Sequence, residues 1–381
     1  MNVFSARYQA RVLVALPCDT ITSKWLVGTT ALREENEVRV LQYDQDNEQL
    51  ACRRTFTHAA EMWDIAPHPN REDLFVTVWA KAGNSSATLW RAPPGAESGA
   101  LEQQAELPGQ TSSMRCALWS TPQPETVVTV EEGHLKKWAI TEAGAEAVST
   151  CPAGELVQLW SGALHPRNAS LLCTAGSNDV QTWDLRTLSR PMGEIKMAHK
   201  QPVRSISFAP HADTRILTAG DDCKLRYWDL RNPGQPLLEL GGHRHWVWRA
   251  LYNPVHDSLV ASCSSDCCVN LYYTPQLAAS AAAAAATAAA GAAATPAGEA
   301  GAAAGAGAAA ASAGQAAPAS AKGASRGADL DGKVVTWDEH EDSVYGLAWS
   351  VADPWLLASL SFDGRVALSK VPKNIKYKIL I

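Results

Sequence analysis

Residues 199–231 read HKQPVRSISFAPHADTRILTAGDDCKLRYWDLR, and the spacing of four polar residues in this stretch decides the fold. His199 comes 23 positions before Asp222. Thr218 stands four positions before that aspartate, and Trp228 follows six positions after it. The first two spacings occur twice more, in His243, Ser262 and Asp266, and in His340, Ser359 and Asp363. A spacing that occurs three times indicates a repeated structural unit.

The unit that this spacing predicts is one blade of a WD40 β-propeller. In such a blade the aspartate accepts a hydrogen bond from the imidazole, which is held by the strand hydroxyl. The hydroxyl also accepts a hydrogen bond from the indole N–H of the tryptophan, so buried polar groups satisfy one another. We therefore interpret these residues as structural, not as a catalytic relay. The units of His243 and His340 lack the tryptophan, so shorter networks are expected there.

The number of blades follows from a series of aromatic residues at the ends of strand-like runs. These residues are 48, 45, 45 and 44 positions apart, close to one WD40 repeat: Trp90, Trp138, Trp183, Trp228 and Tyr272. An earlier unit over residues 25–44 and a last unit over residues 344–371 complete the set. The sequence therefore predicts an all-β, seven-bladed propeller.

A tract of Ala and Gly over residues 278–328 interrupts the repeats. From Tyr272 to Ser369 is 97 residues, about two repeats, although one repeat can be read there. We interpret residues 1–277 as blades one to six, 278–328 as an insertion between blades six and seven, and 329–381 as the seventh blade with a closing strand. The tract has too little large apolar surface to offset its ordering entropy, so it is expected to be disordered or transiently helical. It is either a dispensable spacer or a binding segment.

The composition limits the possible partners. The formal charge is −6, and no block of Lys or Arg indicates a nucleic-acid surface. No run of large apolar residues is long enough to cross a bilayer, and no signal peptide is recognisable. Nine cysteines without paired spacing fit a reducing compartment. We expect a protein that is cytoplasmic or peripheral at a membrane.

Reactive residue types do not combine into a recognisable site. Cys263, Cys267 and Cys268, with His243 and His245 upstream, come nearest to a metal site. Their spacing matches no paired-cysteine zinc motif, and His243 already has a structural role. No phosphate-binding loop or catalytic carboxylate pair is present. We predict no metal, no cofactor and no enzymatic activity.

The surface carries a more specific signal, at the point where the chain enters the first strand of each blade. In blades two to seven this position holds only Trp, Tyr or Arg: Trp63, Arg115, Trp160, Arg204, Trp248 and Tyr345. These residue types dominate the binding energy of protein interfaces. We expect the six side chains to surround the narrow end of the central channel and to bind a partner. The alternative is that they pack between blades as spacers.

Two repeats end in Trp-Asp-Leu-Arg, at residues 183–186 and 228–231. The window Ile216–Arg231 also fits the box of WD40 substrate receptors that dock onto cullin-based ubiquitin ligases. Since this box overlaps the ordinary WD consensus, ligase docking stays an alternative to the interpretation below.

Longer segments narrow the choice of propeller family. They include His243–Asn253, Glu339–Tyr345, Ala358–Arg365, the early Leu26–Thr29 and the closing Val371–Leu380. Together these resemble the WD-repeat proteins that interact with the endosome-associated recycling and Golgi-associated retrograde tethering complexes. The resemblance covers nearly the whole chain. Members of that family carry an acidic insertion between blades six and seven, whereas the insertion here is rich in Ala and Gly.

The resemblance implies a non-enzymatic adaptor for subunits of tethering complexes, in endosomal recycling and endosome-to-Golgi retrograde transport. It implies a protein peripheral at the trans-Golgi network and endosomes, monomeric within a larger assembly. A cullin-RING substrate receptor is the first rival, and a histone-binding propeller the second.

The end of the chain carries a separate expectation about how the ring closes. Lys373, Lys376 and Lys378 alternate with Ile375, Tyr377 and Ile379, which predicts that Lys376–Ile381 is an outer strand that completes a blade. The alternative for this segment is a basic tail that touches a membrane. The run Tyr8–Leu16 is the other candidate for the closing strand.

Overall fold

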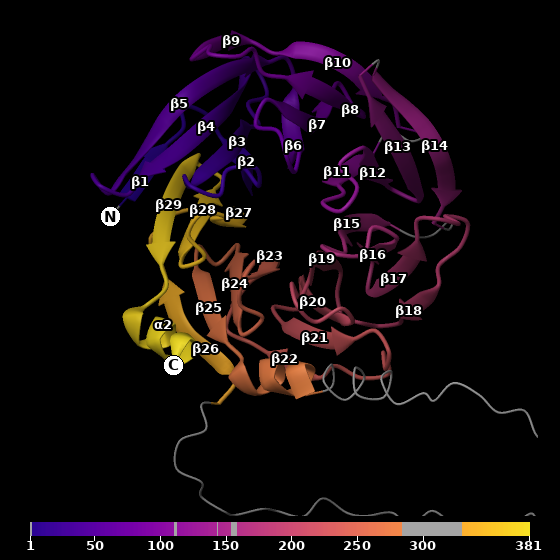
Figure 1. Ribbon diagram of the computed structural model, residues 1–381, viewed down its shortest axis with the longest axis vertical. Coiled ribbons are helices and arrows are strands. Elements are labelled where there is room, and N and C mark those ends of the chain that lie inside the picture. The colour runs from indigo at the N-terminus through magenta and orange to yellow at the C-terminus, as the bar shows by residue number, and fades with distance from the viewer. Residues whose placement is uncertain (1, 110–112, 143, 154–157, 284–329) are drawn as a thin grey trace, which may run out of the picture.

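The computed structural model describes residues 2–109, 113–142, 144–153, 158–283 and 330–381. Its strands form seven sheets arranged as a closed ring around a central axis, and the strands pair antiparallel except for β9 in blade one (Figure 1). The predicted seven-bladed propeller is therefore confirmed.

Each blade holds four strands ordered from the central axis outward, and blade one carries a fifth strand. Blade one holds β2 (Ala10–Ala15), β3 (Lys24–Thr29), β4 (Asn36–Asp44) and β5 (Gln49–His58), with β9 (Ser98–Ala100) parallel to β5. Blade two holds β6 (Glu61–Pro67), β7 (Leu74–Lys81), β8 (Asn84–Arg91) and β10 (Glu102–Leu107). Blade three holds β11 (Met114–Trp119), β12 (Thr126–Glu131), β13 (His134–Thr141) and β14 (Gly144–Pro152).

The remaining blades follow the same order. Blade four holds β15 (Leu159–Leu164), β16 (Leu171–Gly176), β17 (Asp179–Asp184) and β18 (Gly193–Ile195). Blade five holds β19 (Val203–Phe208), β20 (Arg215–Gly220), β21 (Leu225–Asp229) and β22 (Leu238–Leu240). Blade six holds β23 (Val247–Tyr252), β24 (Leu259–Ser264), β25 (Val269–Tyr273) and β26 (Gly332–Trp337). Blade seven holds β27 (Val344–Trp349), β28 (Leu356–Ser361), β29 (Arg365–Lys370) and β1 (Asn2–Ser5).

The hydrophobic core lies between blades. Seven clusters of buried side chains each join two neighbouring blades. Val12 and Leu26 of blade one, for example, pack with Met62 and Phe75 of blade two. The second strands β12, β20, β24 and β28 are buried along their whole length, because each has a neighbouring blade on both faces. This explains why apolar and small residues occupy successive positions in these strands, without strict alternation.

The ring closes through the first strand of the chain. β1 pairs antiparallel with β29, with Phe4 opposite Val366, and supplies the outer strand of blade seven. Of the run Tyr8–Leu16, the part Ala10–Ala15 is the innermost strand of blade one and does not close the ring.

The prediction that Lys376–Ile381 is an outer strand is wrong. This segment belongs to helix α2 (Lys373–Leu380), which begins after Pro372. Ile375 and Ile379 share one helical face and pack on the cluster between blades six and seven. The alternating pattern was compatible with a strand, but β1 already occupies the only free edge of β29.

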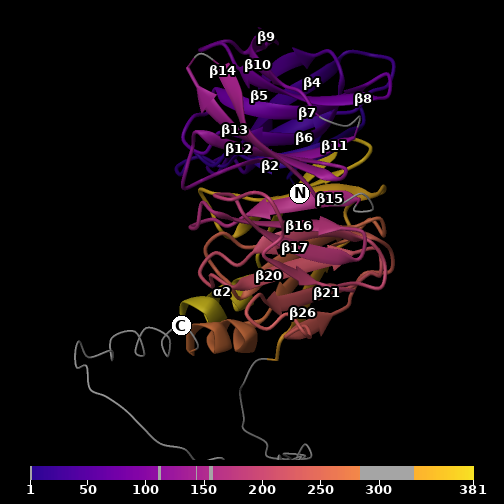
Figure 2. The ribbon, with the colours of Figure 1, turned by 90° about the vertical axis from the view of Figure 1, so that its right-hand side faces the viewer.

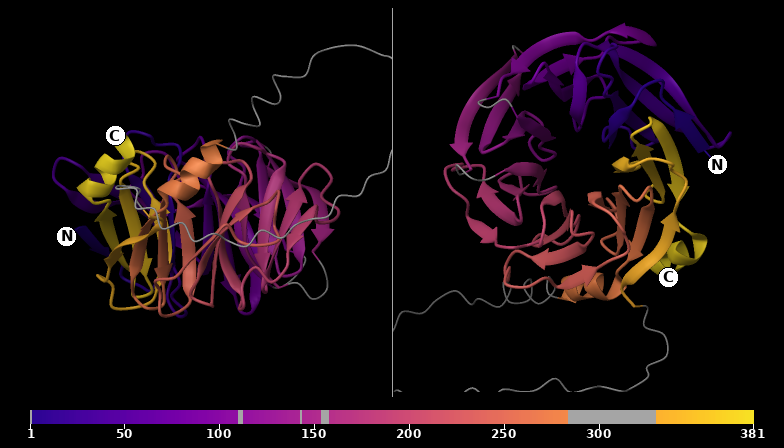
Figure 3. Two further views of the ribbon diagram at one scale, coloured as in Figure 1. Left: turned by 90° about the horizontal axis from the view of Figure 1, so that it is seen from below. Right: turned by 180° about the vertical axis from the view of Figure 1, so that it is seen from behind.

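The Ala/Gly tract lies almost wholly outside the described residues, so the expectation of disorder there stays a prediction. At its start, residues 275–283 are helical, and Asp331 accepts hydrogen bonds from the backbone N–H groups of Gln276 and Leu277 at 2.9 and 3.1 Å. The tract separates the sixth and seventh sequence repeats, and β26, which follows it, pairs with β25 as the outer strand of blade six. Figures 2 and 3 show this helix and α2 on the same side of the ring.

Candidate protein-interaction surface at the channel mouth

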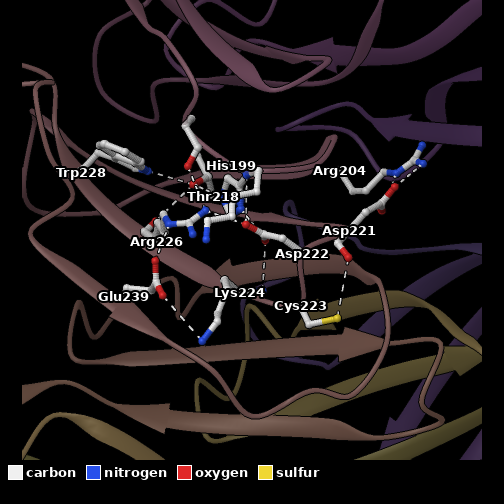
Figure 4. A network of polar contacts seen from close by, with 12 residues as sticks. His199, Arg204, Thr218, Asp221, Asp222, Cys223, Lys224, Arg226, Trp228 and Glu239 are labelled. Atoms are coloured by element: carbon white, nitrogen blue, oxygen red, sulfur yellow. Dashed lines mark hydrogen bonds and ion pairs between the residues drawn. The ribbon is translucent and has the colours of Figure 1, made fainter.

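The predicted tetrad of blade five is brought together by β20, β21 and the loop before β19 (Figure 4). His199 Nδ1 lies 2.8 Å from Asp222 Oδ1, and His199 Nε2 lies 2.8 Å from Thr218 Oγ1. The indole N–H of Trp228 donates to the same hydroxyl at 2.9 Å. Burial alone would raise the pKa of Asp222, but the hydrogen bond from His199 and the Arg226 guanidinium hold that pKa well below its usual value. These groups satisfy one another inside the blade.

Blade six keeps its histidine network and extends it. His243 lies 3.0 Å from Asp266 Oδ2 and 2.7 Å from Ser262 Oγ. Asn270 Nδ2 lies 3.1 Å from His243 Nε2 and 3.4 Å from the hydroxyl of Tyr272. The expectation of a shorter network in blade six is therefore wrong, because an amide and a phenol take the place of the indole.

Blade seven keeps only part of the network. His340 Nε2 lies 2.7 Å from Ser359 Oγ. Asp363 instead accepts hydrogen bonds from the Ser361 hydroxyl and from the backbone N–H of Arg365, so the prediction that it bonds to His340 is wrong. The Nδ1 atom of His340 is buried without a partner among the described residues. Burial lowers the pKa of His340 to about 4.

Blade two holds a partial network that the sequence analysis missed. His58 Nε2 lies 3.1 Å from Thr77 Oγ1, which accepts from the indole N–H of Trp90 at 2.8 Å. His58 precedes Thr77 by 19 positions, the distance that also separates His199 from Thr218. That spacing could have identified it, but Lys81 stands where the aspartate was expected.

The six predicted mouth residues lie together around one central cavity of about 920 Å³. Each is the residue at which the pairing between the first and second strands of its blade shifts register. In blade five, for example, Val203 pairs with Gly220 and Ser205 with Ala219, which leaves Arg204 between them unpaired. A β-bulge of this kind re-aims the side chain of its extra residue. The repeated bulge therefore explains why these six side chains line the same cavity.

Arg11 is a seventh member that the sequence analysis missed. It stands at the same bulge in blade one, between Ala10 and Val12, and lines the same cavity. It was absent from the alignment because its strand, β2, was not recognised as the first strand of blade one. We call these seven residues the channel mouth: Arg11, Trp63, Arg115, Trp160, Arg204, Trp248 and Tyr345.

The side chains of the channel mouth stack on one another across blade boundaries. The guanidinium of Arg11 lies 5.0 Å from the ring centre of Trp63 and 4.6 Å from that of Tyr345. Trp160 lies 4.3 Å from the guanidinium of Arg115 and 4.3 Å from that of Arg204. These are cation–π distances. The contacts agree with the alternative that these side chains pack between blades. Every member nevertheless stays partly accessible to solvent, and Trp63 is 38% exposed.

Four mouth residues are held in place by contacts within their own blades. Each contacts the residue 17 positions later in the chain, which lies in the turn between the second and third strands of the same blade. Arg115 pairs with Glu132 at 3.3 Å, and Arg204 donates twice to Asp221 at 2.9 and 2.7 Å (Figure 4). The Trp248 indole donates to Ser265 Oγ at 2.6 Å. Tyr345 stacks edge-on against Phe362, with ring centres 5.7 Å apart. The mouth is therefore ordered before any partner arrives, which lowers the entropic cost of binding.

An exposed aromatic residue extends the mouth on the side of blade six. Trp246 is 42% exposed and packs edge-on against Trp248, with ring centres 6.0 Å apart. The sequence analysis did not single it out, although it stands two positions before Trp248. Exposed tryptophan beside a pre-ordered aromatic surface is typical of interfaces.

The Trp-Asp-Leu-Arg endings lie away from the channel mouth. Arg186 pairs with Asp184 at 2.6 Å, and Arg231 pairs with Asp229 at 2.6 Å. The two arginine side chains are 75% and 55% exposed, so they remain open to a partner.

The cysteine cluster shows no metal-binding arrangement in the part of the chain that the structure describes. Cys263 is buried, and burial raises the pKa of its thiol to about 12. All nine cysteines are unpaired. Within the described ranges, no helix combines the length and apolar character that a bilayer crossing needs.

Comparison with known proteins identifies the family. The EIPR1 β-propeller model matches residues 2–272, from β1 to the third strand of blade six. The chain belongs to the EIPR1 β-propeller family. A WD domain, G-beta repeat model matches residues 331–368, which covers β26 to β29.

Relatives of this family align along the whole chain. The EARP and GARP complex-interacting protein 1 of Macaca fascicularis is 30% identical over 403 residues, covering 100% of this chain and 98% of the relative. The EARP-interacting protein homolog of Danio rerio is 31% identical over 404 residues, with the same coverage. The WD repeat-containing protein DWA2 of Arabidopsis thaliana is 30% identical over 374 residues, covering 97% of this chain and 95% of the relative. The predicted family resemblance is confirmed.

Proposed function

We propose that this EIPR1-family propeller is a non-enzymatic adaptor that binds multisubunit vesicle-tethering complexes. The observation that carries the proposal is the alignment, over the full chain, with relatives named as interacting with the EARP and GARP complexes. In this proposal the protein supports endosomal recycling and endosome-to-Golgi retrograde transport. It acts on the cytoplasmic side of trans-Golgi and endosomal membranes, as one copy within a larger assembly.

The channel mouth, together with Trp246, is the surface that we assign to the tether. It concentrates Trp, Tyr and Arg side chains, which carry most of the binding energy in protein interfaces. Their mutual stacking orders them before binding, so association loses little side-chain entropy. The surface is partly apolar and partly cationic, and such a combination buries area while retaining specificity.

The residues that could have suggested catalysis support the adaptor role instead. His199, His243 and His340 are each at least nine-tenths buried and hold strand hydroxyls inside their blades. A general base must reach a substrate proton, and these imidazoles are buried within the fold.

The test is affinity purification of the tagged full chain from cells, followed by mass spectrometry. Wild type is expected to recover tether subunits. Trp246→Ala and Trp248→Ala are expected to reduce recovery about tenfold, which corresponds to a loss of ~1.4 kcal/mol. The matched control is Tyr377→Ala on α2, an aromatic residue 60% exposed on another surface, which should leave recovery unchanged.

Circular dichroism and thermal unfolding show whether each variant is folded. Absence of tether subunits from the wild-type sample would contradict the proposed function. Their presence in undiminished amount with both tryptophan variants would contradict the assigned surface.

A substrate receptor of a cullin-RING ligase is the second candidate. The specific observation in its favour is the pair of exposed arginines, Arg186 and Arg231, after consecutive Trp-Asp endings. The same purification discriminates the two functions, because recovery of cullin adaptors that is lost in Arg186→Ala/Arg231→Ala would select this candidate. Recovery of histones would select the chromatin-binding rival.

A further inference from the structure

We infer that the channel mouth contains a carboxylate-binding site centred on Arg11, which takes an Asp or Glu side chain of a protein partner. This inference rests on the proposed role of the mouth as a binding surface and specifies the chemistry that the surface recognises.

Arg11 lies between aromatic rings of two neighbouring blades, as Arg204 also does. It stands at the bulge of β2 in blade one, and its guanidinium contacts Tyr345 of blade seven and Trp63 of blade two. Blades seven and two flank blade one, so the two rings approach the guanidinium from its two neighbouring blades. Arg11 also lines the central cavity, so a side chain that enters the mouth can reach it.

Arg11 lacks the carboxylate that each of the other two mouth arginines has. Arg115 pairs with Glu132 and Arg204 pairs with Asp221, both within their own blades. The residue 17 positions after Arg11 is Gly28, which offers no side chain. Among the described residues, the Arg11 side chain has no hydrogen-bond or ion-pair partner, and its guanidinium lies against the two aromatic rings.

The chemistry of a guanidinium between two rings favours a planar anion. The two rings contact the guanidinium without accepting hydrogen bonds at its N–H groups, which lie in the guanidinium plane and remain able to donate. Two neighbouring N–H groups of a guanidinium can donate side by side to the two oxygens of a carboxylate. Burial and the nearby Arg204 lower the pKa of Arg11, against the opposing effect of Tyr345 and Glu61. An arriving carboxylate would offset this loss of hydration.

The charge at the mouth matches one negative charge better than two. The mouth carries three arginines and two carboxylates within ion-pair distance, Glu132 and Asp221. One positive charge therefore remains, and Glu61 nearby makes a dianion less favourable still. A phosphate group carries close to two negative charges at neutral pH, so we assign the site to a carboxylate side chain.

The test uses purified full-length protein and a random-peptide phage library. Peptides selected on wild type are expected to share one Asp or Glu position. For such a peptide, exchanging that residue for Asn or Gln should weaken binding about tenfold in wild type, as measured by calorimetry. In Arg11→Met the same exchange should change binding less than about twofold, because the charge that it contacts is gone.

Two further variants keep the result interpretable. Arg71→Met removes an exposed guanidinium that pairs with Asp73 outside the channel mouth, so it should leave the preference for the acidic residue intact. Arg11→Lys keeps the positive charge but loses the paired N–H donors of the guanidinium, and should give an intermediate preference for the acidic residue. Thermal unfolding shows whether each variant is folded. If Arg11→Met does not fold, Arg11→Lys serves as the test.

Several outcomes overturn the inference. They are a failure to select peptides, selected peptides without an acidic position, an equal loss in wild type and Arg11→Met, and tighter binding when phosphoserine replaces the acidic residue. Because this assay contains no tether, its result is independent of tether recovery from cells. Acidic-peptide binding without tether recovery would therefore contradict the proposed function alone.

Discussion

At the scale of single residues, a buried hydroxyl joins the parts of a blade. Thr218 is fully buried and bonds to His199 Nε2 and Trp228 Nε1, which come from a loop and from β21. The corresponding Thr77 joins His58 and Trp90 in blade two. A group that satisfies two buried partners matters more than its own hydrogen bonds suggest, because its removal leaves both partners unsatisfied.

Thr218→Val should therefore lower the free energy of unfolding by about 3 kcal/mol, since valine keeps the shape but leaves two buried groups without a partner. Urea unfolding followed by circular dichroism measures the change. Thr141→Val is the control, because the Thr141 hydroxyl bonds at an exposed position and its loss should cost less than about 0.5 kcal/mol. Equal effects at the two sites would refute the role of Thr218 as a hub.

The unpaired Nδ1 of His340 makes a pH-dependent prediction. The pKa of His340 is lowered to about 4 in the folded protein, against an ordinary value of about 6.5 in the unfolded chain. Between these pH values the unfolded chain binds the proton more readily, so stability is fully present above pH ~6.5 and falls as the pH is lowered towards ~4. The loss attributed to His340 is up to about 3 kcal/mol.

His340→Gln should show a shallower decrease across this pH range than wild type, as measured by urea unfolding at a series of pH values. Other histidines with lowered pKa, such as His58, contribute equally to both proteins and cancel in the comparison. Parallel curves for wild type and His340→Gln would contradict the assignment.

At the scale of elements, β1 and α2 have different roles at the outer edge of blade seven. β1 pairs with β29 along four residues, and Phe4 packs against the core between blades seven and one. Helix α2 contributes buried Ile375 but no strand pairing. An outer strand that loses its partner exposes a row of unpaired backbone groups.

Deletion of residues 1–5 should lower the free energy of unfolding by about 3 kcal/mol and promote oligomers, because it removes the β1 ladder and exposes the edge of β29. Deletion of residues 380 and 381 is the control, because it retains Ile375, Ile379 and all strand pairs. Light scattering after size-exclusion chromatography, with thermal unfolding, compares the two. The opposite ranking would show that the C-terminal segment closes the ring.

At the scale of the whole molecule, closure of the ring should let the fold form regardless of where the chain begins and ends. Every blade meets a neighbour on both sides through a core cluster, and β1 joins the first and last segments of the chain in one sheet. A new pair of termini between residues 284 and 329 would interrupt no described strand.

A circular permutant that begins at residue 330, ends at residue 283 and joins 381 to 1 should therefore keep the fold. A Gly/Ser linker of about 20 residues spans roughly 25 Å on average, enough for termini that lie on the same blade. Circular dichroism should match wild type, and the unfolding midpoint should differ by only a few degrees. Loss of the cooperative transition would show that chain order, not ring closure, maintains the structure.

Most of the architecture could be predicted because its signals are local. The 19- and 23-residue spacings from His199, His243 and His340 each lie within one blade. They therefore identify individual blades in the sequence without information on how the blades pack together. The six predicted mouth positions emerged from the same alignment, since each blade repeats its bulge at the same place. Arg11 was missed because β2 carries no histidine signature, and Asp363 was misassigned because a spacing does not report which way a carboxylate turns.

The sequence by itself determined the repeated unit, the number of blades and the family, since each of these is encoded within some forty residues of continuous chain. Only the tertiary structure decided which segment completes blade seven and which side chains stack across the mouth. Pairing of β1 with β29 joins Phe4 to Val366, and the stack joins Arg11 to Tyr345. Both contacts connect opposite ends of the chain, and no local pattern can specify a partner that arrives only when the ring closes.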